Sequence, residues 1–100
     1  MPKKPMFTTY DILLNVASDV IQYCWQIVET HKQLFESPDY LQVFKFEASN
    51  DMLIIKVFQE EYPTTFYFYN YREEFKNFIN ETIYFFEYPD SYQVLFSYEY

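Results

Sequence analysis

Few side chains in this sequence are suited to catalysis or metal binding. There is one histidine, His31, and one cysteine, Cys24. A structural zinc site needs several such ligands, and a calcium loop needs more oxygen ligands than the adjacent Asn50 and Asp51 supply. Cys24 lies in an apolar stretch, which is typical of a buried thiol, and His31 suits a capping or surface role late in a helix. We therefore predict no metal site and no cofactor.

Paired carboxylates are the remaining candidates for acid–base catalysis. Glu60 and Glu61 are adjacent, as are Glu73 and Glu74, so the side chains of each pair diverge and cannot act together on one bond. The chain also contains no glycine. Phosphate-binding loops, dinucleotide-binding turns and nucleophile elbows need glycine for close backbone approach or for a positive φ. The composition therefore predicts a binding protein without catalytic residues, not an enzyme.

The formal charge of -8 is unevenly distributed along the chain. Residues 1–35 are balanced, whereas residues 36–100 contain 12 carboxylates and four bases. Such a field repels nucleic acid and anionic membranes and attracts basic proteins, so we expect no direct binding of nucleic acid or membrane. The competing interpretation of an acidic surface is plain solubility. Binding of single-stranded nucleic acid by aromatic stacking would need a basic strip, for which the sequence offers Lys45, Lys56, Arg72 and Lys76.

Length and composition predict one folded domain over residues 1–100, since 50% of the 100 residues are hydrophobic. We expect residues 1–6 to form a flexible N-terminal tail. The sequence has no run of about 18 apolar residues that could span a membrane, and its start lacks the apolar region of a secretory signal. These features, together with the single cysteine, favour a cytoplasmic protein.

The spacing of apolar residues predicts an α+β fold. Ser18 and Asp19 form a favourable helix start, and the apolar residues that follow fall on one helical stripe. Downstream, apolar runs separated by turn-forming residues predict hairpins. The expected helix spans residues 18–34, a shorter helical segment spans 71–80, and strands span 7–14, 40–47, 52–58, 64–69, 82–87 and 92–98. The predicted fold is one principal helix packed on a mostly antiparallel sheet built from hairpins.

This sheet has more apolar side chains than one helix can cover. Both faces of the strand at residues 52–58 are apolar, and at residues 64–69 Phe66 and Phe68 oppose Tyr67 and Tyr69. We therefore expect Ile54, Phe66 and Phe68 to lie on an exposed protein-binding surface, or on a face buried by a second protomer. The alternative is that the aromatic side chains fill a core with few small residues.

Several motifs resemble an uncharacterised family, domain of unknown function 960. They are Trp25, the runs 59–63, 82–85 and 95–100, and above all the run Asp39-Tyr40-Leu41-Gln42-Val43-Phe44. The resemblance covers most of the chain from about residue 7 onward, although the glycines expected near the first strand-to-helix turn and in the last hairpin are missing. It implies an accessory protein of a phage or mobile cassette, in the cytoplasm of a Gram-positive host, and it supplies no catalytic residues.

The acidic surface then suggests DNA mimicry. Small acidic proteins of phages and cassettes commonly resemble DNA electrostatically and block host enzymes that handle it. One class, the uracil-DNA glycosylase inhibitors, joins helices to an antiparallel sheet. These inhibitors place a Glu-Ser pair at a strand edge against the enzyme, and their apolar pocket receives a side chain that protrudes from the enzyme. Glu36-Ser37 is similar to that pair. The alternative is that these two residues mark the end of a helix before Pro38.

We therefore expect a non-enzymatic DNA mimic that binds and inhibits a host DNA-handling enzyme, with uracil-DNA glycosylase as the most specific target. Glu36 and Ser37 would accept hydrogen bonds from the enzyme. Five further carboxylates would supply the electrostatic field: Asp39, Glu60, Glu61, Glu87 and Asp90. The alternative is a structural or assembly protein that pairs through its aromatic sheet face, either with a phage component or with itself as a homodimer.

Overall fold

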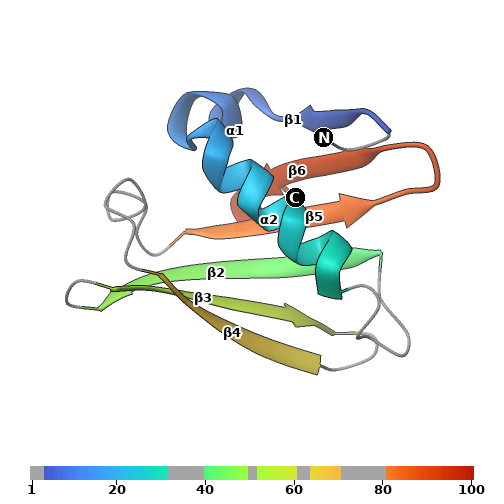
Figure 1. Ribbon diagram of the computed structural model, residues 1–100. Helices are drawn as coiled ribbons and strands as arrows, with labels where there is room; N and C mark the ends of the chain where they lie inside the picture. The colour runs from blue at the N-terminus through green and yellow to red at the C-terminus, as the bar shows by residue number, and fades with distance from the viewer. Residues whose placement is uncertain (1–3, 32–39, 50–51, 61–63, 71–80) are drawn as a thin grey trace.

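The structure, a computed structural model, describes residues 4–31, 40–49, 52–60, 64–70 and 81–100. Figure 1 shows the arrangement of its helices and strands. In chain order they are β1 (Met6–Thr8), α1 (Tyr10–Asn15), α2 (Ser18–His31), β2 (Leu41–Ser49), β3 (Met52–Gln59), β4 (Thr64–Asn70), β5 (Thr82–Glu87), β6 (Tyr92–Phe96) and a 3₁₀ turn, η2 (Ser97–Glu99).

The described strands form one six-stranded sheet in the order β1-β6-β5-β2-β3-β4. β2 pairs antiparallel with β3 on one side and with β5 on the other, and β3–β4 and β5–β6 are antiparallel as well. β1 is parallel to β6 at one edge. The predicted α+β class is confirmed, but the sheet is mixed, because β1 pairs with β6 in parallel while the other described pairs are antiparallel.

Both predicted hairpins are confirmed. Ser49 is the register partner of Met52, so β2 passes into β3 through a short connection that lies outside the described residues. β5 passes into β6 through a turn in which the amide of Tyr88 donates to the carbonyl of Ser91 at 2.8 Å. The strand predicted at residues 64–69 is β4. The helical segment predicted at residues 71–80 lies outside the described residues.

The prediction of one strand over residues 7–14 is wrong. β1 ends at Thr8, and α1 begins at Tyr10. Between them, Thr9 has extended backbone angles of φ -70° and ψ 164°, and its hydroxyl accepts a hydrogen bond from the amide of Ile12 at 3.3 Å. A threonine that satisfies a free amide in the first turn stabilises a helix over the residues that follow. This local cap outweighs the strand preference of the branched and aromatic residues beside it.

Part of the segment predicted as a flexible tail, residues 4–6, lies among the described residues. Met6 is the first residue of β1, and the carbonyl of Pro5 accepts a hydrogen bond from the amide of Tyr92 at 2.9 Å. Lys4 makes an ion pair that is described below. Pairing with β6 therefore holds the described residues before α1 in place, and residues 1–3 lie outside the described part of the chain.

α2 begins at Ser18, as predicted, and is described as far as His31. The carbonyl of Ala17 accepts hydrogen bonds from the amides of Val20 at 3.0 Å and Ile21 at 3.4 Å, which closes the first turn. Asp19 lies in that turn, where a carboxylate interacts favourably with the helix dipole. Within the described ranges α1 is a second helix, of 6 residues against 14 in α2, so α2 is the larger of the two α-helices found there.

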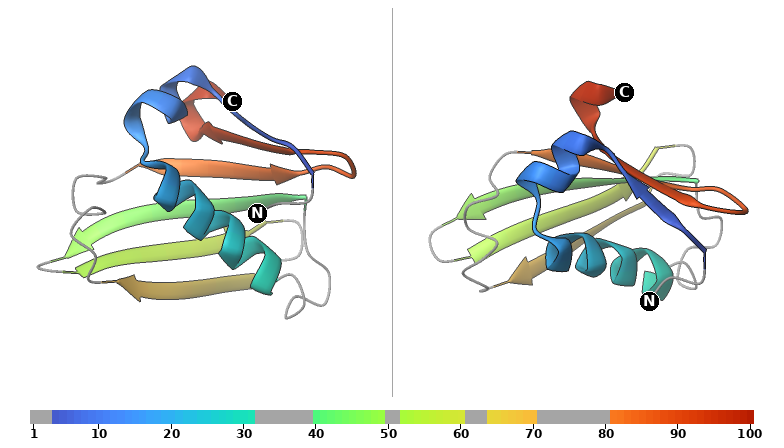
Figure 2. Two further views of the ribbon diagram at one scale, coloured as in Figure 1. Left: turned by 45° about the horizontal axis from the view of Figure 1, so that its top comes forward. Right: turned by 90° about the horizontal axis from the view of Figure 1, so that it is seen from above.

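The core lies between α2 and the face of the sheet that α2 crosses (Figure 2). The predicted helical stripe is confirmed, because Val20, Cys24, Ile27 and Val28 are all buried. Burial of one large apolar side chain contributes about 1.5–3 kcal/mol. The strand side chains in this core are Phe44, Phe46, Ile55, Val57, Ile83, Phe85, Tyr92, Val94 and Phe96.

We expect Thr9→Val to lower the free energy of unfolding by about 1–2 kcal/mol. The variant keeps the shape of the side chain but loses the hydroxyl that caps α1 and donates to Glu99 Oε1 at 2.8 Å. Urea denaturation followed by circular dichroism measures the change. Thr9→Ser keeps the hydroxyl and should remain within about 0.5 kcal/mol of the wild type. Equal stability of Thr9→Val and the wild type would show that the cap is unimportant.

Candidate functional site

Three of the predicted acidic residues lie at one end of the sheet. β3 and β5 both run antiparallel to β2, so their C-terminal ends flank the start of β2. Glu60 follows β3, Glu87 is the last residue of β5, and Asp90 lies in the turn before β6. We call these three residues, at the right-hand end of the sheet in Figure 1, the acidic end.

The other predicted polar residues of the binding site lie outside the described residues: Glu36, Ser37, Asp39 and Glu61. Tyr40, which follows the first three, is described, and its carbonyl accepts a hydrogen bond from the amide of Glu87 at 2.7 Å. The described chain therefore resumes at the acidic end after residues 32–39.

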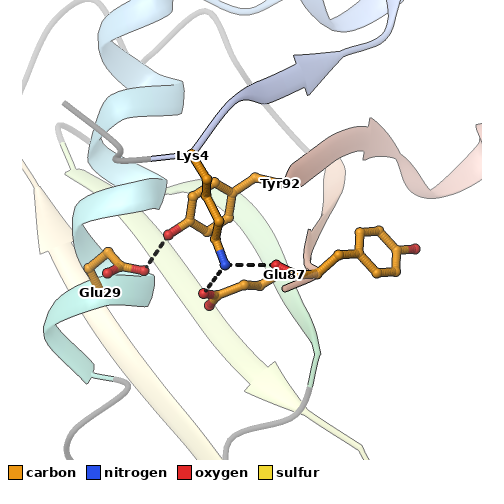
Figure 3. A network of polar contacts seen from close by, with 5 residues as sticks. Lys4, Glu29, Glu87 and Tyr92 are labelled. Atoms are coloured by element: carbon orange, nitrogen blue, oxygen red, sulfur yellow. Dashed lines mark hydrogen bonds and ion pairs between the residues drawn. The ribbon is translucent and has the colours of Figure 1, made fainter. Parts of the chain in front are cut away.

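Glu87 takes part in a polar network (Figure 3). The ammonium group of Lys4 lies 2.8 Å from Glu87 Oε2, donates to the carbonyl of Tyr88 at 2.7 Å, and lies 4.7 Å from the centroid of the Tyr92 ring. The hydroxyl of Tyr92 donates to Glu29 Oε2 at 2.6 Å. The network thus connects the segment before β1, the β5–β6 hairpin and α2.

This network determines which carboxylates of the acidic end can meet another molecule. The side chains of Lys4 and Glu87 are only 24% and 20% exposed, so much of the charge of this pair is compensated internally. Glu60 and Asp90 are exposed. Within the described part of the chain neither of them has a hydrogen-bond or ion-pair partner, so both can bind without first breaking an internal contact.

The three apolar site candidates do not share one face of the sheet. Phe66 and Phe68 on β4 are the register partners of Val57 and Ile55, which belong to the core beneath α2. Ile54 therefore lies on the opposite face, and it is partly buried. The three residues therefore do not form one surface, because neighbouring residues of a strand point to opposite faces and Phe66 is the register partner of Val57. Their role in protein binding stays a prediction.

The face of the sheet away from α2, which we call the open face, carries two lysines. Lys45 on β2 is the register partner of Lys56 on β3, and their ammonium groups lie 5.6 and 5.1 Å from the centroid of the Phe58 ring. Tyr67 on β4, the register partner of Lys56, is 55% exposed. Two of the four bases considered for a basic strip are therefore neighbours, and the other two lie outside the described residues.

An aromatic cluster that the sequence analysis missed also occupies the open face. Phe86 is only 2% exposed although it points away from the core residue Phe85. The turn η2 brings the end of the chain to this side of the sheet (Figure 2). Four tyrosine rings surround Phe86. Their centroids lie 5.7, 6.2, 6.0 and 5.5 Å from the centroid of the Phe86 ring, for Tyr40, Tyr84, Tyr88 and Tyr100 respectively. Aromatic residues at every second position from 84 to 88 were the available signal.

Side chains suited to catalysis do not gather in the described structure. Cys24 is fully buried, and burial raises the pKa of its thiol, which disfavours the reactive thiolate. His31 is the last described residue of α2. In the described ranges, no group of three or more His, Cys, Asp or Glu side chains could hold a metal ion. None of the helices in those ranges is long and apolar enough to cross a bilayer.

The Tyr92–Glu29 hydrogen bond predicts a pH dependence of stability. Burial and this bond raise the pKa of Tyr92 from 10.0 to about 12, so the folded state favours the protonated phenol. The stabilisation should be complete below pH 10.0 and lost as the pH rises toward 12. We expect Tyr92→Phe to be less stable than the wild type at neutral pH, and this difference to shrink in that window. Urea denaturation at several pH values tests this, and a constant difference would contradict it.

Comparison with known proteins places the chain in a family. A family model described as "Staphylococcal protein of unknown function (DUF960)" matches residues 6–99. The fold is similar to that in "Crystal structure of the protein of unknown function from Enterococcus faecalis", with a TM-score of 0.80 and 14% sequence identity over 100% of this chain and 93% of that chain. No curated protein matches. Because the family model covers nearly the whole chain, as the motifs around residues 39–44 indicated, this protein belongs to the DUF960 family.

Proposed function

We propose that this protein is a non-enzymatic DNA mimic of a phage or mobile element, which binds and inhibits a DNA-handling enzyme in the cytoplasm of the host bacterium. The observation that carries the proposal is the acidic end, where Glu60 after β3 lies at the same end of the sheet as Glu87 and Asp90 of the β5–β6 hairpin. A basic DNA-binding surface is the complementary partner. Uracil-DNA glycosylase is the most specific target that we propose.

Of the three lysines in the described ranges, only Lys4 is paired with a carboxylate of the acidic end, Glu87. Lys45 and Lys56 lie on the open face, and their ammonium groups are over Phe58, the next-to-last residue of β3. With a formal charge of -8 for the chain, the exposed carboxylates of the acidic end remain available to attract a basic surface.

Aromatic contact area adjoins the acidic end and supports binding to a protein. Tyr40, at the start of β2, is 52% exposed and packs against Phe86 and Tyr88. Tyrosine buries a large ring on binding and keeps a hydroxyl for hydrogen bonding, which is why it is common at interfaces. Tyr40 therefore supplies exposed aromatic area beside the acidic end.

A uracil-excision assay tests the proposed target. Purified protein is titrated against bacterial uracil-DNA glycosylase acting on a uracil-containing oligonucleotide. We expect inhibition that is complete near one equivalent and that weakens as salt is added, because the attraction between exposed charges is screened. Full activity at a large molar excess of the protein would exclude this enzyme as the target.

Charge reversal at the acidic end should slow association. We expect the double variant Glu60→Lys with Asp90→Lys to bind uracil-DNA glycosylase about tenfold or more slowly than the wild type at low salt. The reason is that the electrostatic field that steers association is reversed locally. Stopped-flow or surface-plasmon-resonance kinetics measure the rate. The matched control, Glu47→Lys with Glu81→Lys, makes the same change in net charge near the end of β2 and before β5, at the opposite end of the sheet. Equal slowing by both double variants would show that only net charge matters.

A structural or assembly protein is the second candidate. It is favoured by Tyr40 and Tyr67, which are 52% and 55% exposed on the open face. If the open face holds copies together, sedimentation equilibrium should show an oligomer that Tyr40→Ser weakens. An oligomer unaffected by that change, or a monomer, would argue against self-association through this face.

A further inference from the structure

The two edges of the sheet differ in how they are protected from pairing with another strand. The edge strand β1 has 3 residues and follows Lys4, which pairs with Glu87. Short length and charged residues are devices by which natural proteins keep a sheet edge from pairing. The other edge strand, β4, has 7 residues, none of them charged, and a proline precedes each of the two strands, Pro5 and Pro63. β4 is therefore the unprotected edge.

The outer side of β4 is suited to receive another strand. β4 pairs with β3 in continuous register from Thr64 to Asn70, without a bulge that would twist the edge away. Among the described strands, β3 is its only partner, so the outward backbone amides and carbonyls have no strand beside them. Its residues are threonine, phenylalanine, tyrosine and asparagine. Uncharged segments of this length that are rich in β-branched and aromatic residues have a strong tendency to pair.

We propose that β4 pairs antiparallel with β4 of a second copy, so that the two sheets continue into one another across a two-fold axis. A pair centred on Tyr67, the middle residue of the strand, brings the most residues into register. Phe66 then lies opposite Phe68 of the partner subunit, and Thr64 lies opposite Asn70 of the partner subunit. No like charges meet, and aromatic residues face one another across the seam, which is a favourable cross-strand arrangement.

The net charge of each copy does not oppose this pairing strongly. In an antiparallel pair the strand directions of the two copies are reversed, so the two acidic ends lie at opposite ends of the joined sheet. Charges separated by more than about 8–10 Å are largely screened at physiological salt. Both acidic ends also remain free in such a dimer. The inference therefore does not rest on the proposed inhibitor function and is compatible with it.

Sedimentation equilibrium of the full chain tests the dimer, from roughly 10 µM to 1 mM protein at about 0.15 M salt. We expect the wild type to show twice the chain mass of 12.4 kDa, and Tyr67→Lys to return the mass to 12.4 kDa, because two cations would face one another at the centre of the seam. Because Lys56 is the register partner of Tyr67, Tyr67→Glu is the variant that places opposite charges across β3 and β4 of the monomer, and it should return the mass to 12.4 kDa as well. An equimolar mixture of Tyr67→Lys and Tyr67→Glu should recover the dimer mass.

The control is Tyr10→Lys, which makes the same replacement at a 73% exposed residue of α1, away from β4, and should leave the dimer intact. Amide hydrogen exchange followed by NMR gives a measurement specific to the strand edge. Amides of β4 should exchange more slowly in the wild type than in Tyr67→Lys, whereas packing between open faces would not protect them. A wild-type monomer over the whole concentration range, or a dimer that survives Tyr67→Lys, would overturn the proposal. No enzyme is present, so the result is separate from the inhibition assay.

Discussion

The pairing of β2 on both of its sides is the constraint on which the rest of the molecule depends. Because β2 is antiparallel to β3 and to β5, one register decides which residues of three strands share a face. It places Phe44 and Phe46 in the core under α2, and it brings the ends of β3 and β5 together with Glu60 and Glu87. The core and the acidic end are therefore two results of the same hydrogen-bonded strand.

The aromatic composition serves both faces of the sheet. Beneath α2, phenyl rings fill the core. On the other face no helix is needed over Phe86, because surrounding tyrosines exclude water from it while their hydroxyls can remain hydrated. Aromatic pairs of this kind contribute about 0.5–1.5 kcal/mol beyond the area they bury. Aromatic residues that fill a buried volume and aromatic residues that form a binding surface are therefore both found on the open face. Phe86 is enclosed, whereas Tyr40 and Tyr67 are exposed.

The features that could be predicted from the sequence are those set by local periodicity. The stripe of α2 and the two hairpins follow from residues close together in the chain. The change from strand to helix at Thr9 depends on one side-chain hydrogen bond, and the pairing of β1 with β6 joins distant segments. For the site, the acidic positions could be named but not their grouping or the pairing of Glu87. The relative faces of Ile54 and Phe66 depend on the β3–β4 register, which alternation within each strand does not determine.

The parallel pairing of β1 with β6 has a consequence for how the chain folds. Lys4 and Glu87 are separated by 83 positions, so the contact that anchors the first strand must close nearly the whole chain. Contacts between distant segments form late, because their loop-closure entropy is offset only after the intervening chain is ordered. During synthesis β1 leaves the ribosome well before β6, its partner. The nascent chain must therefore carry β1 without its partner strand until β6 has emerged, and β6 is an open sheet edge until β1 docks on it.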